Sequence, residues 1–147
     1  MTLTLATCTY QEYRPTMGLP VRTTVGGARF FTEPIAGHAQ AITPSRDLVD
    51  AARSGLPADA YELQYRRQLN AVGLDAIRAE LEFIARRNAA GDTPLVLLCF
   101  DVLSKPNNWC HRSQFARFWG EQTGEVIPEL GSQPRPTVQA PPTLFDL

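Results

Sequence analysis

The residues best suited to chemistry lie close together in the last third of the chain, in the stretch LLCFDVLSKPNNWCHRSQF. An apolar run ends at Cys99, a loop that begins with Asp101 follows, and a helix is predicted to begin at Cys110-His111-Arg112. The first turn of a helix presents unpaired N–H groups and a partial positive charge, which together bind anions. In that position Arg112 would hold a phosphate with its planar fork, and the thiolate of Cys110 would be stabilised. His111 and Asp101 are suited to proton transfer, so we predict Cys110, His111 and Asp101 as catalytic and Arg112 as ligand-binding.

Each of these residues also has a structural interpretation. Cys99 lies in an apolar run and fits the core, so we expect it to be a packing residue. A single cysteine at a helix start is more often structural than nucleophilic, and His111 fits a capping or packing role. Arg112 equally suits an ion pair with Asp101 or with the C-terminal strand. The crowding of these residue types at one strand–helix junction nevertheless favours a functional site.

No metal is predicted at this junction. Cys8, Cys99, Cys110 and His111 would have to meet at one sheet edge to hold zinc, and no CxxC or HxxxH spacing supports such a site. The Cys–Arg spacing is too short for a phosphatase-type loop, and Walker, GxGxxG and GxSxG motifs are absent from the sequence. We therefore expect no metal and no cofactor.

The elements that position these residues follow from apolar patterning. Strands are predicted at 2–10, 21–25, 94–100 and 126–127, and the last but one is an apolar run typical of a central strand buried on both faces. Helices are predicted at 44–53, where Thr43 would cap and Pro44 would begin the helix, and at 59–72, at 74 to about 90 and at 111–123. The stretch 28–41 is predicted to be irregular. This order favours an α/β fold: an open, mostly parallel sheet flanked by helices on both faces, in three layers.

Sites in such sheets form beyond the carboxyl ends of the strands. The segments 8–13, 22–27 and 101–112 are predicted to lie there. Arginines interleaved with aromatic residues can hold phosphates and stack on bases, which favours Arg22, Tyr13 and Trp109 as ligand-binding residues beside Arg112. The alternative is that these side chains pack within loops or are solvated.

Composition sets the class of protein. The chain has 147 residues and a net charge of −1, which suits a single domain over 1–131 without a general attraction to nucleic acid. Three cysteines argue against a disulfide scaffold and for a reducing compartment. The sequence shows neither a signal peptide nor an apolar run long enough for a membrane span, so we expect a cytoplasmic protein with no membrane partner.

The chain resembles the Domain of Unknown Function 488 family over about residues 2 to 130. The resemblance lies in Pro20-Val21-Arg22, where the family shows Asp-Val-Arg, in the LLC-x-D block of 97–101, where Glu is common at the last position, and above all in the Cys-His-Arg of 110–112. The family pattern implies an α/β fold and a shared site around Arg22, Cys99, Asp101 and the Cys-His-Arg block. It implies no established reaction.

Residues 132–147 are rich in Pro, Gln, Ser and Thr, and we expect a disordered tail. The tail ends in a compact Leu-Phe pair and resembles the short peptides by which bacterial replication and repair proteins bind the sliding clamp. Those peptides carry a Gln about three residues ahead of the pair, whereas here Gln139 precedes Leu144-Phe145 by five. The resemblance implies partner binding through Gln139, Leu144 and Phe145; the alternative is that the apolar residues fold back onto the domain.

Two classes of function follow from these patterns. In the first, the chain binds a phosphate-bearing nucleotide or nucleic acid at the strand–helix junction around Cys110-His111-Arg112, with or without catalysis, in DNA metabolism. In the second, it is a non-catalytic interaction protein, a phage or host factor, whose tail binds a partner such as the sliding clamp.

Overall fold

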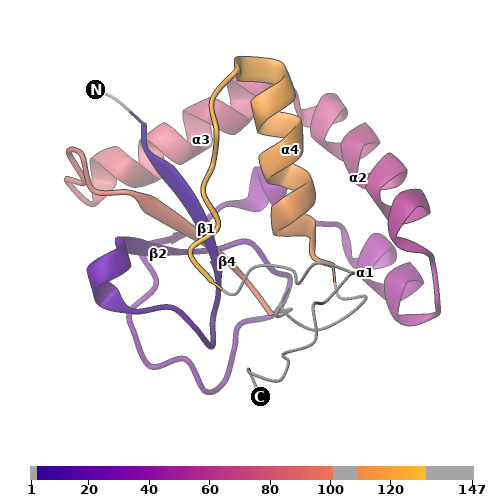
Figure 1. Ribbon diagram of the computed structural model, residues 1–147, viewed down its shortest axis with the longest axis horizontal. Helices are drawn as coiled ribbons and strands as arrows, with labels where there is room; N and C mark the ends of the chain where they lie inside the picture. The colour runs from indigo at the N-terminus through magenta and orange to yellow at the C-terminus, as the bar shows by residue number, and fades with distance from the viewer. Residues whose placement is uncertain (1–2, 101–108, 132–147) are drawn as a thin grey trace, which may run out of the picture.

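A computed structural model describes residues 3–100 and 109–131 of the chain. Its sheet has four strands, β1 (Leu5–Thr9), β2 (Leu19–Arg22), β3 (Gly37–His38) and β4 (Leu95–Cys99), in the order β1-β4-β2-β3. All three strand pairs are parallel (Figure 1). Every residue of β4 is buried, as predicted for a central strand. The predicted α/β class with parallel strands is confirmed.

Four α-helices follow the predicted order. They are α1 (Arg46–Arg53), α2 (Ala58–Val72), α3 (Leu74–Arg87) and α4 (His111–Thr123), with two 3-10 turns, η1 (Pro15–Met17) and η2 (Gln40–Ile42). The predicted cap of α1 is wrong by two residues. The hydroxyl of Ser45 accepts the Leu48 N–H and caps the helix, whereas the Thr43 hydroxyl donates to the Ala39 carbonyl.

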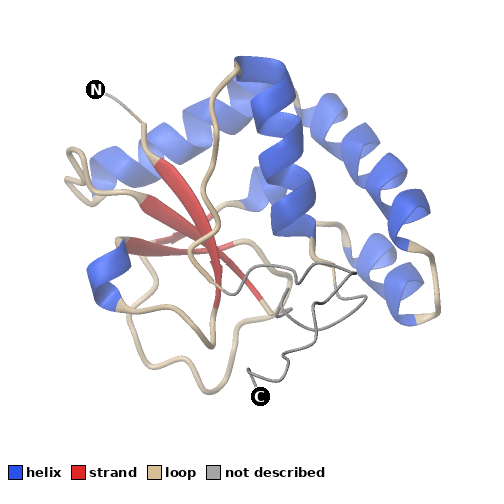
Figure 2. Ribbon diagram, viewed as in Figure 1, coloured by secondary structure: helices blue, strands red, loops and turns tan. Residues whose placement is uncertain are grey.

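The helices gather on one face of the sheet. Their buried apolar residues form one core with Leu5, Val21, Leu95 and Leu97 of the strands. The side chains of Cys8, Val96 and Leu98 point to the other face of the sheet. There they pack against η1 and the loop that carries Phe31. Figure 2 shows the α-helices above and to the right of the strands, with the long loops below. The second covering layer is thus made by η1 and loops, in place of further α-helices.

The strand predicted at 126–127 is wrong. The chain instead meets β1 two residues later, where the Thr7 N–H donates to the Pro128 carbonyl at 2.9 Å and the Leu130 N–H donates to the Thr7 carbonyl at 2.7 Å. Pro128 has no N–H to donate, which limits this pairing to an isolated bridge at Glu129. The bridge places the Glu129 carboxylate beside β1 and α4. Conversely, the stretch predicted to be irregular contains β3, which is too short to show a strand pattern.

Within the described residues, none of the helices combines the length and the apolar character needed to span a membrane.

Candidate functional site

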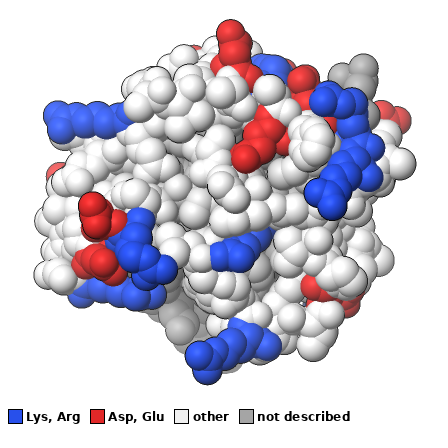
Figure 3. Space-filling view, turned by 180° about the vertical axis from the view of Figure 1, so that it is seen from behind, with Lys and Arg blue, Asp and Glu red and all other residues white. Residues whose placement is uncertain are grey.

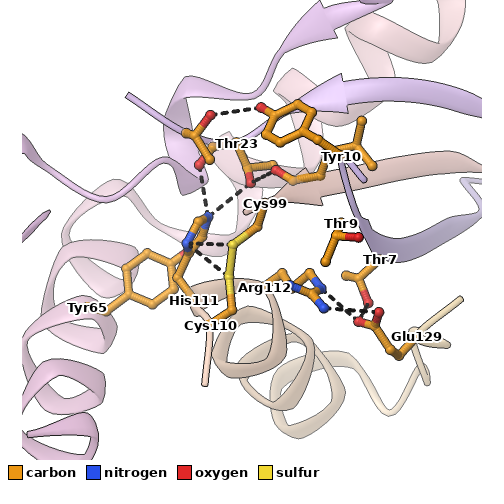
Figure 4. The surroundings of a disulfide bond; sticks show 12 residues. Thr7, Thr9, Tyr10, Thr23, Tyr65, Cys99, Cys110, His111, Arg112 and Glu129 are labelled. Carbon is orange, nitrogen blue, oxygen red and sulfur yellow. Dashed lines mark hydrogen bonds and ion pairs between the residues drawn. A yellow bond between two sulfur atoms is a disulfide. The ribbon is translucent and has the colours of Figure 1, made fainter. Parts of the chain in front are cut away.

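A disulfide bond joins the end of β4 to the start of α4. Cys99 is the last residue of β4, Cys110 is the N-cap of α4, and both are buried (Figure 4). The expectation that Cys99 is only a packing residue is corrected here, because its sulfur is bonded to Cys110. The cysteine count argued against a disulfide scaffold, and the structure nevertheless contains this one bond, with Cys8 as the free third cysteine.

The imidazole of His111 lies against the disulfide, and its hydrogen bonds determine which nitrogen carries the proton. The Thr23 hydroxyl donates its hydrogen to the Leu98 carbonyl at 2.7 Å, so it can only accept from His111 Nε2, 3.0 Å away. The Thr23 carbonyl, 2.9 Å from the same nitrogen, is also an acceptor. Nε2 therefore carries the hydrogen, and Nδ1 presents a lone pair. That lone pair faces the two sulfurs, each 3.7 Å from Nδ1.

Burial keeps this imidazole uncharged. It lowers the pKa of His111 from 6.5 to about 4; the nearby Arg112 guanidinium acts in the same direction, and the bond to the Thr23 carbonyl opposes it. The ring also packs edge-to-face with that of Tyr65, which is itself fully buried, with ring centroids 5.8 Å apart. At neutral pH His111 is thus a fixed, neutral acceptor directed at the sulfurs.

A pocket of about 460 Å³ opens beside this group, at the carboxyl ends of β2 and β4. That volume is typical of small-molecule sites. Its lining is mainly apolar and includes aromatic side chains from three segments of the chain. It also includes one arginine, one cysteine of the disulfide and the histidine beside it. The lining residues are Thr24, Val25, Gly26, Pro44, Val49, Ala52, Arg53, Tyr61, Cys99, Phe100, Trp109 and His111.

One wall of the pocket is a loop that the protein holds in place before any ligand arrives. Arg22 donates from Nε to the Thr24 carbonyl at 2.8 Å and from Nη2 to the Val25 carbonyl. The Thr24 hydroxyl donates to the Gly26 carbonyl, so it accepts from the Tyr10 hydroxyl at 2.8 Å. Arg22, predicted as a ligand-binding residue, acts here on the loop that lines the pocket and is not itself in the lining.

Arg112 forms a buried ion pair with Glu129. Its side chain is fully buried, with Nε 2.9 Å from Oε1 and Nη2 3.2 Å from Oε2 of Glu129. Glu129 also accepts the Thr7 hydroxyl at 2.8 Å and the Gly131 N–H at 3.0 Å. This is the ion pair with the C-terminal segment that the sequence left open as an alternative, and Arg112 does not line the pocket.

Two other residues named from the sequence lie on the opposite face of the sheet. The Tyr13 hydroxyl donates to the Gly18 carbonyl, and its ring packs on Phe31. Cys8 is fully buried and its thiol donates to the Met17 sulfur at 3.9 Å. The structure therefore does not bring Tyr13 or Cys8 to the group formed by Cys99, Cys110 and His111.

The thiol of Cys8 gives the protein a measurable sensitivity to alkaline pH. Burial raises its pKa from 9.0 to about 11, and the Glu129 carboxylate adds to the effect. The neutral thiol stabilises the fold fully below pH 9, and that stability is lost as the pH rises toward 11. We expect the free energy of unfolding of the wild type to fall between these values by on the order of 2 kcal/mol more than that of Cys8→Ala. Urea denaturation at a series of pH values measures this, and parallel curves for the two proteins would contradict it.

The remaining predicted residues lie outside the described part of the chain. These are Asp101 in the loop between β4 and α4, and Gln139, Leu144 and Phe145 at the C-terminus. Trp109 is the first described residue after the loop, and it both lines the pocket and packs on Tyr61 with ring centroids 4.7 Å apart. The structure thus brings together Trp109, Cys110 and His111 from the predicted set.

Sequence reasoning missed Cys99 as a partner of Cys110 and missed Arg53, Tyr61 and Glu129. Arg53 is the last residue of α1, and its only sequence signal was a basic residue at a helix end. Tyr61 lies on the apolar stripe of the helix predicted at 59–72, and such a stripe gives no indication that one of its members also lines a pocket.

Comparison of the chain with protein-family models, with curated proteins and with solved structures found no match in any of the three. The resemblance to the Domain of Unknown Function 488 family stays a hypothesis that rests on the sequence blocks alone.

Proposed function

We propose that the chain binds a phosphate-bearing nucleotide in the pocket beside Cys99 and His111. The observation that carries this proposal is the charge of the lining. Among the described residues that line the pocket, Arg53 is the only one with a charged side chain at neutral pH, and none is a carboxylate. An anionic group is the charge that such a pocket accepts.

The aromatic residues support a planar group as the other half of the ligand. The half-buried Trp109 rests on Tyr61, and Phe100 lines the same pocket with 40% of its surface exposed. Aromatic faces held in place by packing stack on nucleobases at little entropic cost. The wall at 24–26 is already held by Arg22, so this side of the pocket does not have to be ordered when a ligand binds.

The charges on the face seen in Figure 3, together with the net charge of the chain, favour a small ligand over an extended nucleic acid. Figure 3, which shows the molecule from behind, has basic and acidic side chains interspersed among the described residues of that face, without a broad basic stripe. The net charge of −1 agrees with this. Long nucleic acids are usually bound along a continuous basic surface, so the nucleotide is the form of the prediction that we retain.

The proposal is tested by calorimetric titration with AMP, with adenosine and with inorganic phosphate. AMP should bind more tightly than either fragment. Trp109→Ala should weaken AMP binding roughly 5- to 150-fold, because stacking on one aromatic residue contributes about 1–3 kcal/mol. Arg53→Ala should weaken AMP binding and leave adenosine binding unchanged.

A matched control for Arg53 lies on the same helix. Arg46 is exposed at the other end of α1 and does not line the pocket, so Arg46→Ala should bind AMP like the wild type. Equal loss of binding in Arg46→Ala and Arg53→Ala, or no loss in Trp109→Ala, would contradict the proposal. Circular dichroism of each variant confirms that the fold is retained.

We further propose, from the sequence of the tail, that the chain binds the sliding clamp. The Leu144-Phe145 pair would fill an apolar pocket of the clamp, with Gln139 as the accompanying polar contact. Removal of residues 132–147 should abolish binding to a purified sliding clamp, measured by surface plasmon resonance, and leave AMP binding intact. Unchanged clamp binding after truncation would contradict this.

A further inference from the structure

We propose that Cys99, Cys110 and His111 form a binding site for a thiophilic divalent ion, of which Zn²⁺ is the type, that becomes available when the disulfide is reduced. The sequence predicted no metal because the three residues lack a recognised ligand spacing. The structure brings their ligand atoms within 4.8 Å of one another. The inference is independent of the nucleotide proposal, because it concerns these three side chains and needs no nucleotide.

The distances suit a tetrahedral ion. Metal bonds of about 2.3 Å to sulfur and 2.1 Å to nitrogen place the sulfur and nitrogen ligands about 3.6 Å apart. Each sulfur here is 3.7 Å from His111 Nδ1. Two thiolates on one ion lie about 3.8 Å apart, so the sulfurs must separate once their bond is broken. The Cα atoms of Cys99 and Cys110 are already 7.2 Å apart, which leaves room for that separation by side-chain rotation.

The imidazole is held in the form that a metal requires. His111 is more than nine-tenths buried, and its Nε2–H donates to the Thr23 carbonyl. This bond fixes the tautomer and directs the Nδ1 lone pair at the sulfurs (Figure 4). A backbone carbonyl is one of the usual partners for the second nitrogen of a metal-binding histidine.

The surroundings also suit a metal site with an open position. Two thiolates and one neutral imidazole balance the charge of a divalent ion, and the nearby Arg112 is already balanced by Glu129. Cys99 and His111 both line the pocket. Three protein ligands leave the fourth position of the ion to a water molecule or a ligand that enters from the pocket, as in catalytic rather than structural zinc sites.

Reduction is the step that creates the ligands. A dithiol reductant transfers two electrons and two protons to the Cys99–Cys110 bond by thiol–disulfide exchange and is itself oxidised to a disulfide. The two thiols formed then give up two protons as their sulfurs bind the metal. The third cysteine, Cys8, takes no part because it lies on the opposite face of the sheet.

The test is a titration of the full chain with Co²⁺, whose spectrum reports its ligands. One sample is reduced with a phosphine and desalted under argon, and a matched sample stays oxidised. The reduced protein should bind about one Co²⁺ per chain, with a thiolate-to-cobalt charge-transfer band and the visible bands of a tetrahedral ion. Zn²⁺ should displace the Co²⁺, and binding should release about two protons, measured with a pH indicator. The oxidised sample should show none of these signals.

Variants assign the ligands. Cys8→Ser should behave like the wild type, and Cys110→Ser should lose the two-thiolate spectrum. If Cys110→Ser does not fold, the comparison of oxidised with reduced wild type still tests whether metal binding requires the free thiols. A reduced wild type without the charge-transfer band, or equal metal binding by the oxidised protein, would overturn the inference. Nucleotide titrations of the oxidised protein are unaffected by either outcome, so failure of this inference and failure of the nucleotide proposal are distinguishable.

Discussion

Replacement of Arg112 by methionine should lower the free energy of unfolding by about 3–5 kcal/mol, because it leaves the carboxylate of Glu129 without its buried cation. The Arg112 side chain is fully buried and that of Glu129 is 12% exposed, so water compensates little. Glu129 also accepts a hydrogen bond from the Thr7 hydroxyl of β1. The substitution should therefore weaken the contact between the first turn of α4 and the edge strand β1, in addition to the ion pair itself. Urea denaturation measures the difference.

The same helix provides the control. Arg117 forms an ion pair with Glu62 at 2.6 Å, but its side chain is 54% exposed. Arg117→Met should therefore cost no more than about 1 kcal/mol. The double variant Arg112→Met/Glu129→Gln should lose much less than the sum of the two single variants, because no buried charge is left unpaired. Equal effects of Arg112→Met and Arg117→Met would show that the buried pair does not stabilise the fold.

Reduction of the disulfide should be the second large effect. The bond closes a segment with a sequence separation of 11, and the entropic model for a loop of that length gives about 3 kcal/mol. For a chain of this size the melting temperature should fall by roughly 6–12 °C on reduction. Calorimetry with a phosphine reductant and a chelator measures this, because the chelator prevents a metal from replacing the bond.

Cysteine variants separate this effect from a general action of the reductant. Cys8→Ser should show the same fall on reduction as the wild type. Cys99→Ser/Cys110→Ser should melt at the lower temperature with or without reductant. A melting temperature of the wild type that does not change on reduction would contradict a stabilising role for the bond.

The elements of this fold were predictable where one signal dominated. The spacing of Ile77, Leu81 and Ile84 favours a helix where α3 lies, and the unbroken apolar run of 94–100 predicted the buried central strand observed at 95–99. β3 has two residues, which is too few for any periodicity, and it forms because β2 offers a free edge. The cap of α1 was misplaced because Thr43, Pro44 and Ser45 each match a helix start, and only tertiary contacts select Ser45.

The candidate site was predictable in place but not in composition. A strand end, a loop and a helix start in sequence indicated the junction, and Trp109, Cys110 and His111 lie there. The bond from Cys110 to Cys99 and the pairing of Arg112 with Glu129 depend on how β4, α4 and the C-terminal segment pack. Arg53 and Tyr61 reach the pocket from α1 and α2, whose positions on the sheet no local pattern encodes.

The most direct test of a nucleotide in this pocket uses the two tryptophans of the chain. Trp109 lines the pocket, whereas Trp119 is 1% exposed and its indole N–H donates to Glu125 at 3.1 Å. In a titration of ¹⁵N-labelled protein with AMP, the indole resonance of Trp109 should shift progressively to saturation while that of Trp119 stays in place. A Trp109 resonance that does not move at saturating AMP would contradict the proposed function.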